Sequence, residues 1–325
     1  MSPDLPTRLA VLAAAVLIDV AVGYPDVLYR HIGHPVTWIG RAVGWLEDKL
    51  NRSAWSVPVR KVAGVACVAS VLTGTIGSAA LAQVALAAYG SGGLAILAVL
   101  ASSLSAIRSL DCHVAAVASA LDRGGLAAGR KAVSMIVGRD PDALDQAGVA
   151  RAAIESLAEN FSDGVVAPLL WFALAGLPGM LAYKAINTAD SMIGHRTPRY
   201  EAFGWAAARL DDVVNLPAAR LSALLLALAA CVLPGASPRA AMRSVWRDAG
   251  KHRSPNAGWP EAAMAGALGL KIAGPRAYHG VLGDFAYMGD GRAELTAVDI
   301  RRSLWLYRLA TAVGWAIAVV AAALV

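Results

Sequence analysis

Residues 62–88 read VAGVACVASVLTGTIGSAALAQVALAA, without a single charged side chain. A helix needs roughly 20 apolar residues to cross the hydrocarbon core of a bilayer, so this stretch is long enough for one full span. Leu304–Val325 is the other unambiguous candidate. Small residues within the first stretch, such as Gly74, Gly77 and Ser78, suggest close approach of a neighbouring helix.

Four further apolar stretches are shorter or interrupted: Leu9–Val22, Leu94–Ile107, Val165–Tyr183 and Ala218–Leu233. Gly176-Leu-Pro-Gly179 lies in the middle of the third of these, where it would break a helix and permits a re-entrant hairpin. We therefore predict an all-α fold, a polytopic membrane helical bundle with four to six membrane segments and helical cytoplasmic loops. Residues 1–325 are treated as a single membrane-embedded domain.

The composition supports a membrane protein. Of the 325 residues, 57% are hydrophobic and 16% are charged, against roughly 25% charged in soluble domains. The net charge of +6 fits loops biased to Lys and Arg on the cytoplasmic side, namely 24–61, 108–164 and 234–303; the side of 184–217 is left open. Basic runs interleaved with aromatic residues are absent from the sequence, so we expect no nucleic-acid partner.

The most informative polar stretch is RAAIESLAENFSD at 151–163. One face of an α-helix here would carry residues spaced by four: Arg151, Glu155, Glu159 and Asp163. A solvated face neutralised by Arg151 is the simplest interpretation. The face runs directly into an apolar stretch, however, where an unpaired carboxylate is costly. A magnesium-bound phosphate would explain the pattern better, because Mg²⁺ favours carboxylate and phosphate oxygens.

Two further polar clusters follow. In the first, Lys184, Asn187 and Asp190 share a helix face at the edge of an apolar element, with helix capping as the alternative. In the second, Arg209 and Asp212 form an ordinary i, i+3 pair, while Asp211 and Asn215 share another face. An ion pair with a purely structural role is the alternative there.

Weaker signals complete the set. Asp19 lies late in an apolar stretch and needs a partner, such as a basic loop residue or His34. Arg108 ends an apolar segment, where snorkelling to the interface would also explain it. The sequence contains no phosphate-binding P-loop, no HExxH zinc motif, no GxSxG elbow and no convincing dinucleotide fingerprint.

The polar motifs together resemble the CobD/CbiB family of cobalamin biosynthesis, the adenosylcobinamide-phosphate synthases. The resemblance runs from about Asp19 to Gly291. It rests on HPV at 34–36, SAIRSL at 105–110, AIESLAEN at 153–160, DGVVAP at 163–168, KAINTADSMIG at 184–194, ARLDD at 208–212 and SPNAG at 254–258. His195 is a small departure, because the family pattern leads us to expect an aromatic residue there.

The resemblance implies a multi-pass inner-membrane enzyme with its active site on the cytoplasmic side. Its reaction would join the propionate carboxylate of adenosylcobyric acid to aminopropanol or its phosphate, forming an amide at the expense of ATP. A carboxylate is a poor electrophile and must be activated, and Mg²⁺ would shield the triphosphate. The partners would be these substrates, the bilayer, and either a second copy of the chain or other enzymes of the corrinoid pathway.

Roles for individual residues follow as a hypothesis within this resemblance. The metal would be bound by Glu159, Asp163 and Asp190, with assistance from Asp212. The catalytic residues would be Glu155, Lys184 and His252, the last as a base for the incoming amine. The substrate-binding residues would be Arg108, Asn160, Asn187, Ser191, Arg209, Arg220, Ser254 and Asn256.

Two other functions fit parts of the pattern. An ion-coupled transporter would also place acids and Asn near broken apolar segments, but the inverted halves that it predicts are not apparent in the sequence. A non-catalytic membrane partner of the corrinoid pathway would leave three acid-rich clusters without a role.

Overall fold

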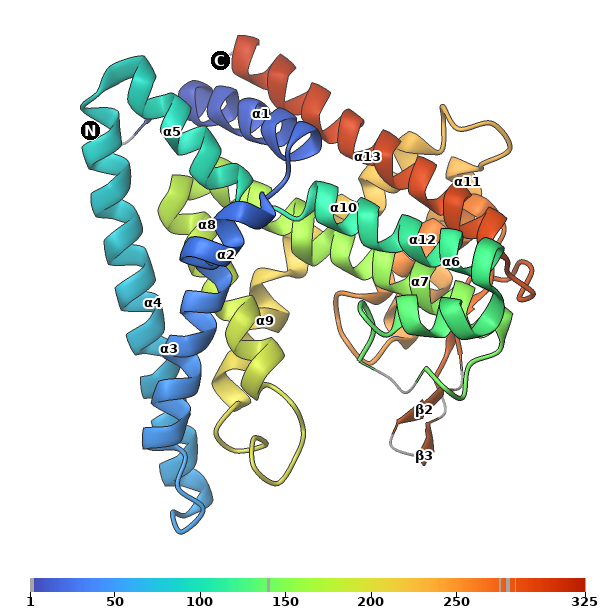
Figure 1. The fold of residues 1–325 in the computed structure, drawn as a ribbon, viewed down its shortest axis with the longest axis horizontal. Coiled ribbons are helices and arrows are strands. Elements are labelled where there is room, and N and C mark those ends of the chain that lie inside the picture. The colour runs from blue at the N-terminus through green and yellow to red at the C-terminus, as the bar shows by residue number, and fades with distance from the viewer. Residues whose placement is uncertain (1–2, 139–140, 275, 279–280, 284, 325) are drawn as a thin grey trace. The chain divides into compact units, whose positions relative to one another are not determined.

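The computed structural model describes residues 3–138, 141–274, 276–278, 281–283 and 285–324, and it confirms the predicted all-α class (Figure 1). The helices of the N-terminal half are α1 (Leu5–Ala21), α2 (Asp26–Ile32), α3 (Pro35–Leu50), α4 (Val57–Ala87), α5 (Gly90–Ser102), α6 (Ile107–Val133) and α7 (Gln146–Asn160). The π-helix η1 (Phe161–Val166) follows, and then α8 (Ala167–Ile193), α9 (Trp205–Val214), α10 (Leu216–Ala229), α11 (Pro238–Asp248), the 3₁₀ turn η2 (Ala249–Lys251), α12 (Gly258–Leu268) and α13 (Ala297–Leu324).

Two short antiparallel pairs interrupt the helices between α12 and α13. They are formed by β1 (Ile272–Ala273) with β4 (Tyr287–Met288), and by β2 (Arg276–Tyr278) with β3 (Val281–Gly283). Each strand is only two or three residues long, which explains why the sequence carries no alternating strand pattern.

Four helical segments among the described residues are long and apolar enough to cross a membrane: Val57–Ala87, Gly90–Val133, Gln146–Ile193 and Ala297–Leu324. The number rises to six if two bent helix pairs each count as one span. The first pair, Leu5–Ala21 with Asp26–Leu50, is bent by 103°, and the second, Trp205–Val214 with Leu216–Ala229, by 41°. The predicted range of four to six membrane segments is therefore confirmed.

The chain packs into two compact units. Unit 1 comprises Met1–Ala106, Ala167–Asn215 and Ala318–Val325; unit 2 comprises Ile107–Val166 and Leu216–Ile317. Segments far apart in the sequence therefore contribute to each unit.

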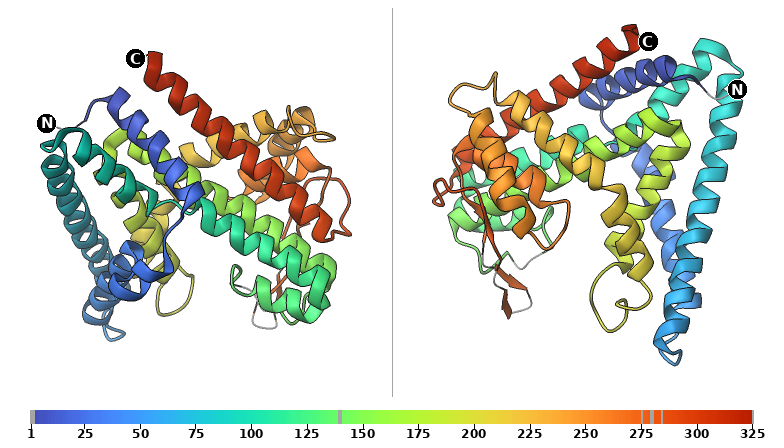
Figure 2. Two further views of the ribbon diagram at one scale, coloured as in Figure 1. Left: turned by 45° about the horizontal axis from the view of Figure 1, so that its top comes forward. Right: turned by 180° about the vertical axis from the view of Figure 1, so that it is seen from behind.

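Unit 1 is built around α4, which packs against α3 on one side and α8 on another. The long α4 and the neighbouring α3 lie side by side in all views (Figures 1 and 2). Val43, Cys67 and Phe203 belong to the buried core that joins these helices. At Gly64 a Cβ atom would lie 1.8 Å from the Phe203 carbonyl oxygen, so a larger residue would push the two segments apart.

The prediction that a neighbouring helix approaches closely at Gly74 and Gly77 is wrong. A Cβ atom at either position would meet nothing within 4 Å, so neither glycine is required for packing inside the unit. The sequence shows small residues but not which of them face a partner. Gly64, ten residues before Gly74, is the position where the backbone of another segment comes close.

The break predicted within the apolar stretch Val165–Tyr183 is present in α8. Gly176 has φ 67° and ψ −155°, outside the helical region, and Pro178 follows without a backbone N–H to continue the hydrogen-bond ladder. Gln83 on α4 reaches the break, and its Oε1 accepts a hydrogen bond from the Leu177 amide at 2.8 Å. The broken turn is thereby satisfied inside the protein, as membrane helices require.

Unit 2 is formed by α10, α11 and α12, which pack on one another, and by α6 and α7 with η1. The right-hand panel of Figure 2 shows α11 and α12 side by side. Ser237 caps α11 by accepting a hydrogen bond from the Ala240 amide. The C-terminal end of α11 is fixed by Asp248, whose buried carboxylate accepts hydrogen bonds from Arg247, Lys251 and the Gly289 amide.

Candidate functional site

The predicted site residues fall into two groups, one in each unit. Unit 1 holds Lys184, Asn187, Asp190, Ser191, Arg209 and Asp212. Unit 2 holds Arg108, Glu155, Glu159, Asn160, Asp163, Arg220, His252, Ser254 and Asn256.

A hydrogen-bonded chain of polar side chains links α8 to α9 in unit 1. Asn187 donates to Asp211 Oδ1 at 3.3 Å, and Asn215 donates to Asp211 Oδ2 at 2.9 Å. The Tyr183 hydroxyl in turn donates to Asn215 Oδ1 at 2.9 Å. Both oxygens of Asp211 are therefore used to orient amides, and Asn187 is fixed on the face that it shares with Lys184.

Asp211 is the residue that the predicted site lacked. The i, i+4 spacing correctly placed Asp211 on the same helix face as Asn215. Its contact with Asn187 joins two different helices, and residue spacing within one helix cannot predict such a contact. Asp212 points elsewhere and pairs with Arg209 at 3.3 Å, which confirms the predicted i, i+3 pair. The Asp190 carboxylate lies within electrostatic range of both acids, so three like charges share this end of α8 and α9.

Two other predicted residues of unit 1 lie on α8 with different surroundings. Lys184 is close enough to His34 for their charges to interact. The His34 ring itself accepts a hydrogen bond from the Val36 amide and caps α3. Ser191 donates to the carbonyl of Asn187 within its own helix, and its side chain is exposed.

In unit 2, the acidic stretch of 151–163 does not continue as one α-helix. The α-helical register ends at Asn160, and the π-helix Phe161–Val166 contains Asp163. Wider π-turns are rare and often occur at functional sites. The predicted single face is therefore correct for Glu155 and Glu159, but the register changes before Asp163.

The side chains of this stretch differ in exposure. Glu155 is buried, with 5% of its surface accessible, whereas Glu159 and Asn160 are exposed. The contacts of Arg151 differ from those of a residue that only neutralises the acids of the 151–163 face. Its guanidinium donates to the Ala293 carbonyl at 2.8 Å and lies 3.8 Å from Asp145.

Arg220 and Asn256 are in direct contact in unit 2. Arg220 on α10 donates to Asn256 Oδ1 at 2.9 Å, and its guanidinium stacks over the Trp259 ring at 4.4 Å from the centroid. Stacking leaves the edge of the planar guanidinium available for hydrogen bonds, which suits recognition of carboxylate or phosphate. The two residues were predicted from different motifs, and the structure brings them together.

His252 sits in a tight turn that holds this loop. Ser254 donates its backbone N–H to His252 Nδ1 at 3.0 Å, and Nε2 lies 3.8 Å from Oε1 of the buried Glu261. Burial lowers the pKa of His252 and favours the neutral ring; because Nδ1 accepts the Ser254 amide, the ring proton of that form is on Nε2. Because Nδ1 already accepts a hydrogen bond, the geometry favours a positioning role over that of a base. Ser254 Oγ accepts from the amides of Asn256 and Ala257.

The oxygen-rich donors in both units fit a hard cation such as Mg²⁺ better than zinc, which prefers nitrogen and sulfur ligands. Within the described ranges, however, no three His, Cys, Asp or Glu side chains are arranged to hold a metal ion. Magnesium therefore stays a prediction, and phosphate oxygens of a substrate would have to supply part of its coordination shell.

Several apolar helices long enough to cross a membrane, with polar networks at their ends, define a helical membrane protein. A family model described as "CobD/Cbib protein" matches residues 12–307. Cobalamin biosynthesis protein CobD of Rhizobium meliloti is 50% identical, over 94% of this chain and 94% of the relative. The protein of the same name from Rhodobacter capsulatus is 51% identical to this chain, over 93% of this chain and 94% of the relative. The one from Brucella suis is 47% identical, over 92% of each.

The chain therefore belongs to the CobD/CbiB family of cobalamin biosynthesis proteins, as its motifs indicated. No solved structure matches it significantly.

Proposed function

We propose that the protein is an ATP-dependent ligase that joins a corrinoid carboxylate, the propionate of adenosylcobyric acid, to aminopropanol or aminopropanol phosphate. The observation that carries the proposal is the family match over 12–307, combined with cationic and amide side chains that hydrogen bonds hold in fixed orientations.

In the proposed reaction, a carboxylate oxygen of the corrinoid attacks the γ-phosphorus of ATP, and ADP leaves. The amine nitrogen then attacks the carbonyl carbon of the acyl phosphate, inorganic phosphate leaves, and the amine loses a proton. Both steps develop negative charge on phosphate oxygens, which positioned cations stabilise. Arg220, Arg108, Arg209 and Lys184 are the residues that we assign to this task.

Fixed amides would orient the corrinoid, whose periphery carries many amide groups. Asn187 is held by Asp211, and Asn256 is held by Arg220. A side-chain amide has two donor hydrogens and two acceptor lone pairs, so this residue type can recognise both donors and acceptors of a substrate. Preorganisation of this kind lowers the entropic cost of bringing two substrates into contact.

The acids that we assign to magnesium with the nucleotide are Glu159 and Asp163 of unit 2, and Asp190 and Asp212 of unit 1. Bound Mg²⁺ supplies charge neutralisation at the phosphates. Glu155, buried at the start of the acidic stretch, would assist in proton transfer. We place the protein in the inner membrane, with this site on the cytoplasmic side, where ATP is found.

An ion-coupled transporter, the alternative function, would need a discontinuous helix whose free backbone groups bind the transported ion. The break in α8 at Gly176 has this appearance, but Gln83 hydrogen-bonds to the Leu177 amide at the break. That contact favours a structural function for the break.

Product analysis tests the proposal. The purified protein in detergent is incubated with adenosylcobyric acid, aminopropanol phosphate and magnesium ATP, and the corrinoid is analysed by mass spectrometry. The proposal predicts a corrinoid heavier by the amine minus one water, formed only when ATP is present and without any membrane gradient. Unchanged corrinoid with an active, folded preparation would reject it.

A further inference from the structure

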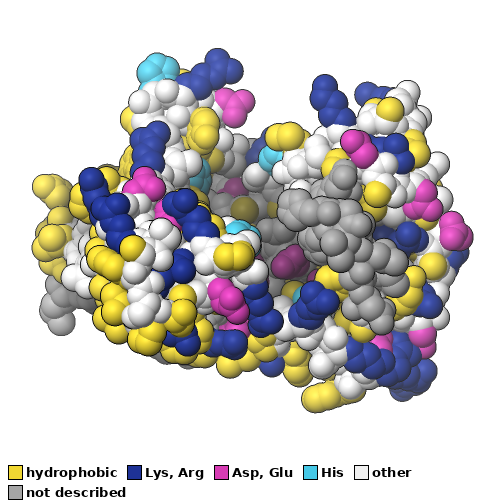
Figure 3. All heavy atoms as spheres, turned by 90° about the horizontal axis from the view of Figure 1, so that it is seen from below, with side chains coloured by type: hydrophobic (Ala, Val, Ile, Leu, Met, Phe, Trp, Pro, Cys, Tyr) yellow, Lys and Arg dark blue, Asp and Glu magenta, His cyan; other side chains and the backbone are white. Residues whose placement is uncertain are grey.

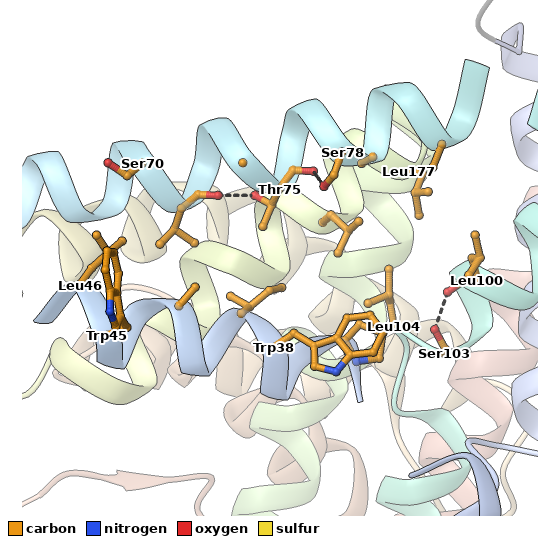
Figure 4. Close-up of a pocket in the computed structure, with 18 residues that line it drawn as sticks. Trp38, Trp45, Leu46, Ser70, Thr75, Ser78, Leu100, Ser103, Leu104 and Leu177 are labelled. Carbon is orange, nitrogen blue, oxygen red and sulfur yellow. Dashed lines mark hydrogen bonds between the residues drawn. The ribbon is translucent and has the colours of Figure 1, made fainter. Parts of the chain in front are cut away.

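An apolar cavity of unit 1 lies among α3, α4, α5 and α8, with a volume of about 620 Å³ (Figure 4). Trp45 and Leu46 mark one end of it, and Trp38 and Leu104 lie further along (Figure 4). Trp38 is 48% exposed and Trp45 is 62% exposed, whereas Leu104 at the floor is buried. The cavity is therefore open at the surface of the unit.

The hydroxyl groups in the lining do not make the cavity polar. Ser70 donates to the Ala66 carbonyl, Thr75 to that of Val71 and Ser103 to that of Leu100, each within its own helix. With the hydroxyl protons directed into the helices, the wall presents carbon atoms to whatever occupies the space. A water molecule would find too few hydrogen-bond partners there.

The position of the cavity on α4 indicates that the occupant comes from the bilayer. α4 is a candidate membrane span, and only 22% of its most apolar window is buried within the protein. Most of this helix therefore faces outward. In Figure 3 hydrophobic side chains gather on the side of unit 1 where α3 and α4 lie.

Charge and length indicate which kind of molecule fits. Trp38, Trp45 and Lys49 are spaced at seven and four residues, so they form one exposed stripe along α3 that ends in a cation. Arg52 follows just beyond the helix. Lys49 lies eleven residue steps after Trp38, which corresponds to about 16 Å of helix, close to half of the roughly 30 Å hydrocarbon core.

We propose that this cavity, from Trp38 to Trp45 between α3 and α4, binds one acyl chain of an anionic phospholipid. Lys49 and Arg52 would contact the lipid phosphate, since basic residues at the end of a membrane segment attract anionic headgroups. The occupied cavity would pack against Leu177 and Leu181 of α8, the helix that carries Lys184 and Asn187.

Gly74 offers a direct test, because it lines the cavity and a Cβ there meets nothing within 4 Å. In Gly74→Leu the new side chain would occupy the acyl site. Gly77→Leu is the matched control: Gly77 is equally open, lies one turn away on the same helix and is not part of the lining. Ala42→Phe fills the same space from α3 and provides a second variant if Gly74→Leu folds poorly.

Native mass spectrometry of the full-length protein in detergent would count bound lipids, with phosphatidylglycerol compared to phosphatidylcholine of identical chains. We expect one phosphatidylglycerol per chain to be retained in preference to phosphatidylcholine. Gly74→Leu and Ala42→Phe should weaken binding by about tenfold or more, whereas Gly77→Leu should bind as the unmodified protein does. Lys49→Glu with Arg52→Glu should abolish the preference for phosphatidylglycerol.

Three results would overturn the proposal. The first is undiminished lipid retention in both cavity-filling variants. The second is equal retention of the two lipids by the unmodified protein. The third is a dimer that the cavity-filling variants dissociate, because the cavity would then hold a second copy of the chain.

Discussion

The side-chain carbonyl of Gln83 accepts a hydrogen bond from the backbone amide of Leu177 at 2.8 Å, inside the core of unit 1. These residues lie 94 positions apart in the chain. The contact satisfies the amide that the turn at Gly176 leaves without a helical acceptor. An apolar helix can therefore change direction within unit 1 without exposing backbone to lipid.

Gln83→Leu should destabilise the protein. The Leu177 amide would stay buried without its acceptor, which costs roughly 1–3 kcal/mol. The measurement is the melting temperature in detergent, with Val84→Ala as control because Val84 is 49% exposed on the same helix. Equal melting temperatures for the two variants would contradict the role assigned to Gln83.

Asp211→Asn should reduce amide formation more than Glu201→Gln, a control substitution at an exposed acid of unit 1 that lies outside the proposed site. Asp211 accepts hydrogen bonds from two amides, and an asparagine there would present an N–H group to one of the N–H donors. Misplacing Asn187 should lower turnover by about tenfold or more. The measurement is the initial rate of each variant on equally folded preparations; equal rates for Asp211→Asn and Glu201→Gln would show that Asp211 is not the orienting residue.

Asp248→Asn should lower stability near neutral pH. Burial alone would raise the pKa of Asp248, but hydrogen bonds from Arg247, Lys251 and the Gly289 amide outweigh it and lower the pKa from 3.8 to about 2. The folded state therefore binds the proton less tightly than the unfolded state. The stabilisation, roughly 2 kcal/mol, is complete above the unfolded pKa and is lost as the pH falls from about 4 towards 2.

Thermal denaturation at two pH values tests this sign. The melting temperature of Asp248→Asn should be well below that of the unmodified protein near neutral pH, and the gap should narrow at about pH 3. A gap that is constant or wider in acid would mean that the carboxylate charge is not the stabilising feature.

His252→Asn should lower activity without changing the shape of its pH dependence. The ring is neutral because burial lowers its pKa, and Nδ1 is engaged by the Ser254 amide. A residue that only positions the 252–256 loop contributes no titration of its own. The rate profile should therefore keep its acidic limb, and loss of that limb in the variant would restore His252 as the base.

Much of the fold could be predicted from the sequence because the deciding features are local. The uncharged run at 62–88 predicts α4, and Gly176 with Pro178 predicts the break in α8. The π-helix at Phe161–Val166 has no comparable signal in the sequence, since its residues would also fit an α-helix. Asp19 illustrates a long-range contact that spacing cannot predict: its carboxylate accepts a hydrogen bond at 2.7 Å from Ser105, which lies 86 positions further along the chain.

The residue types of the candidate site could be predicted from the sequence, but most of their contacts could not. Asn187, Arg220 and Asn256 were predicted as substrate-binding residues, and each contacts another segment of the chain in the structure. Asp211 was passed over in favour of its neighbour Asp212. Adjacent residues point about 100° apart on a helix, so only the position of α8 beside α9 decides which of the two reaches Asn187.

Isotope transfer tests the central claim, activation of the carboxylate by ATP, most directly. The corrinoid is prepared with both oxygens of its reacting carboxylate replaced by ¹⁸O, and the phosphate released during amide formation is analysed by mass spectrometry. Attack of the carboxylate on the γ-phosphorus predicts one ¹⁸O atom in each inorganic phosphate. Amide formation with unlabelled phosphate, or with the label in AMP, would contradict the proposed acyl phosphate.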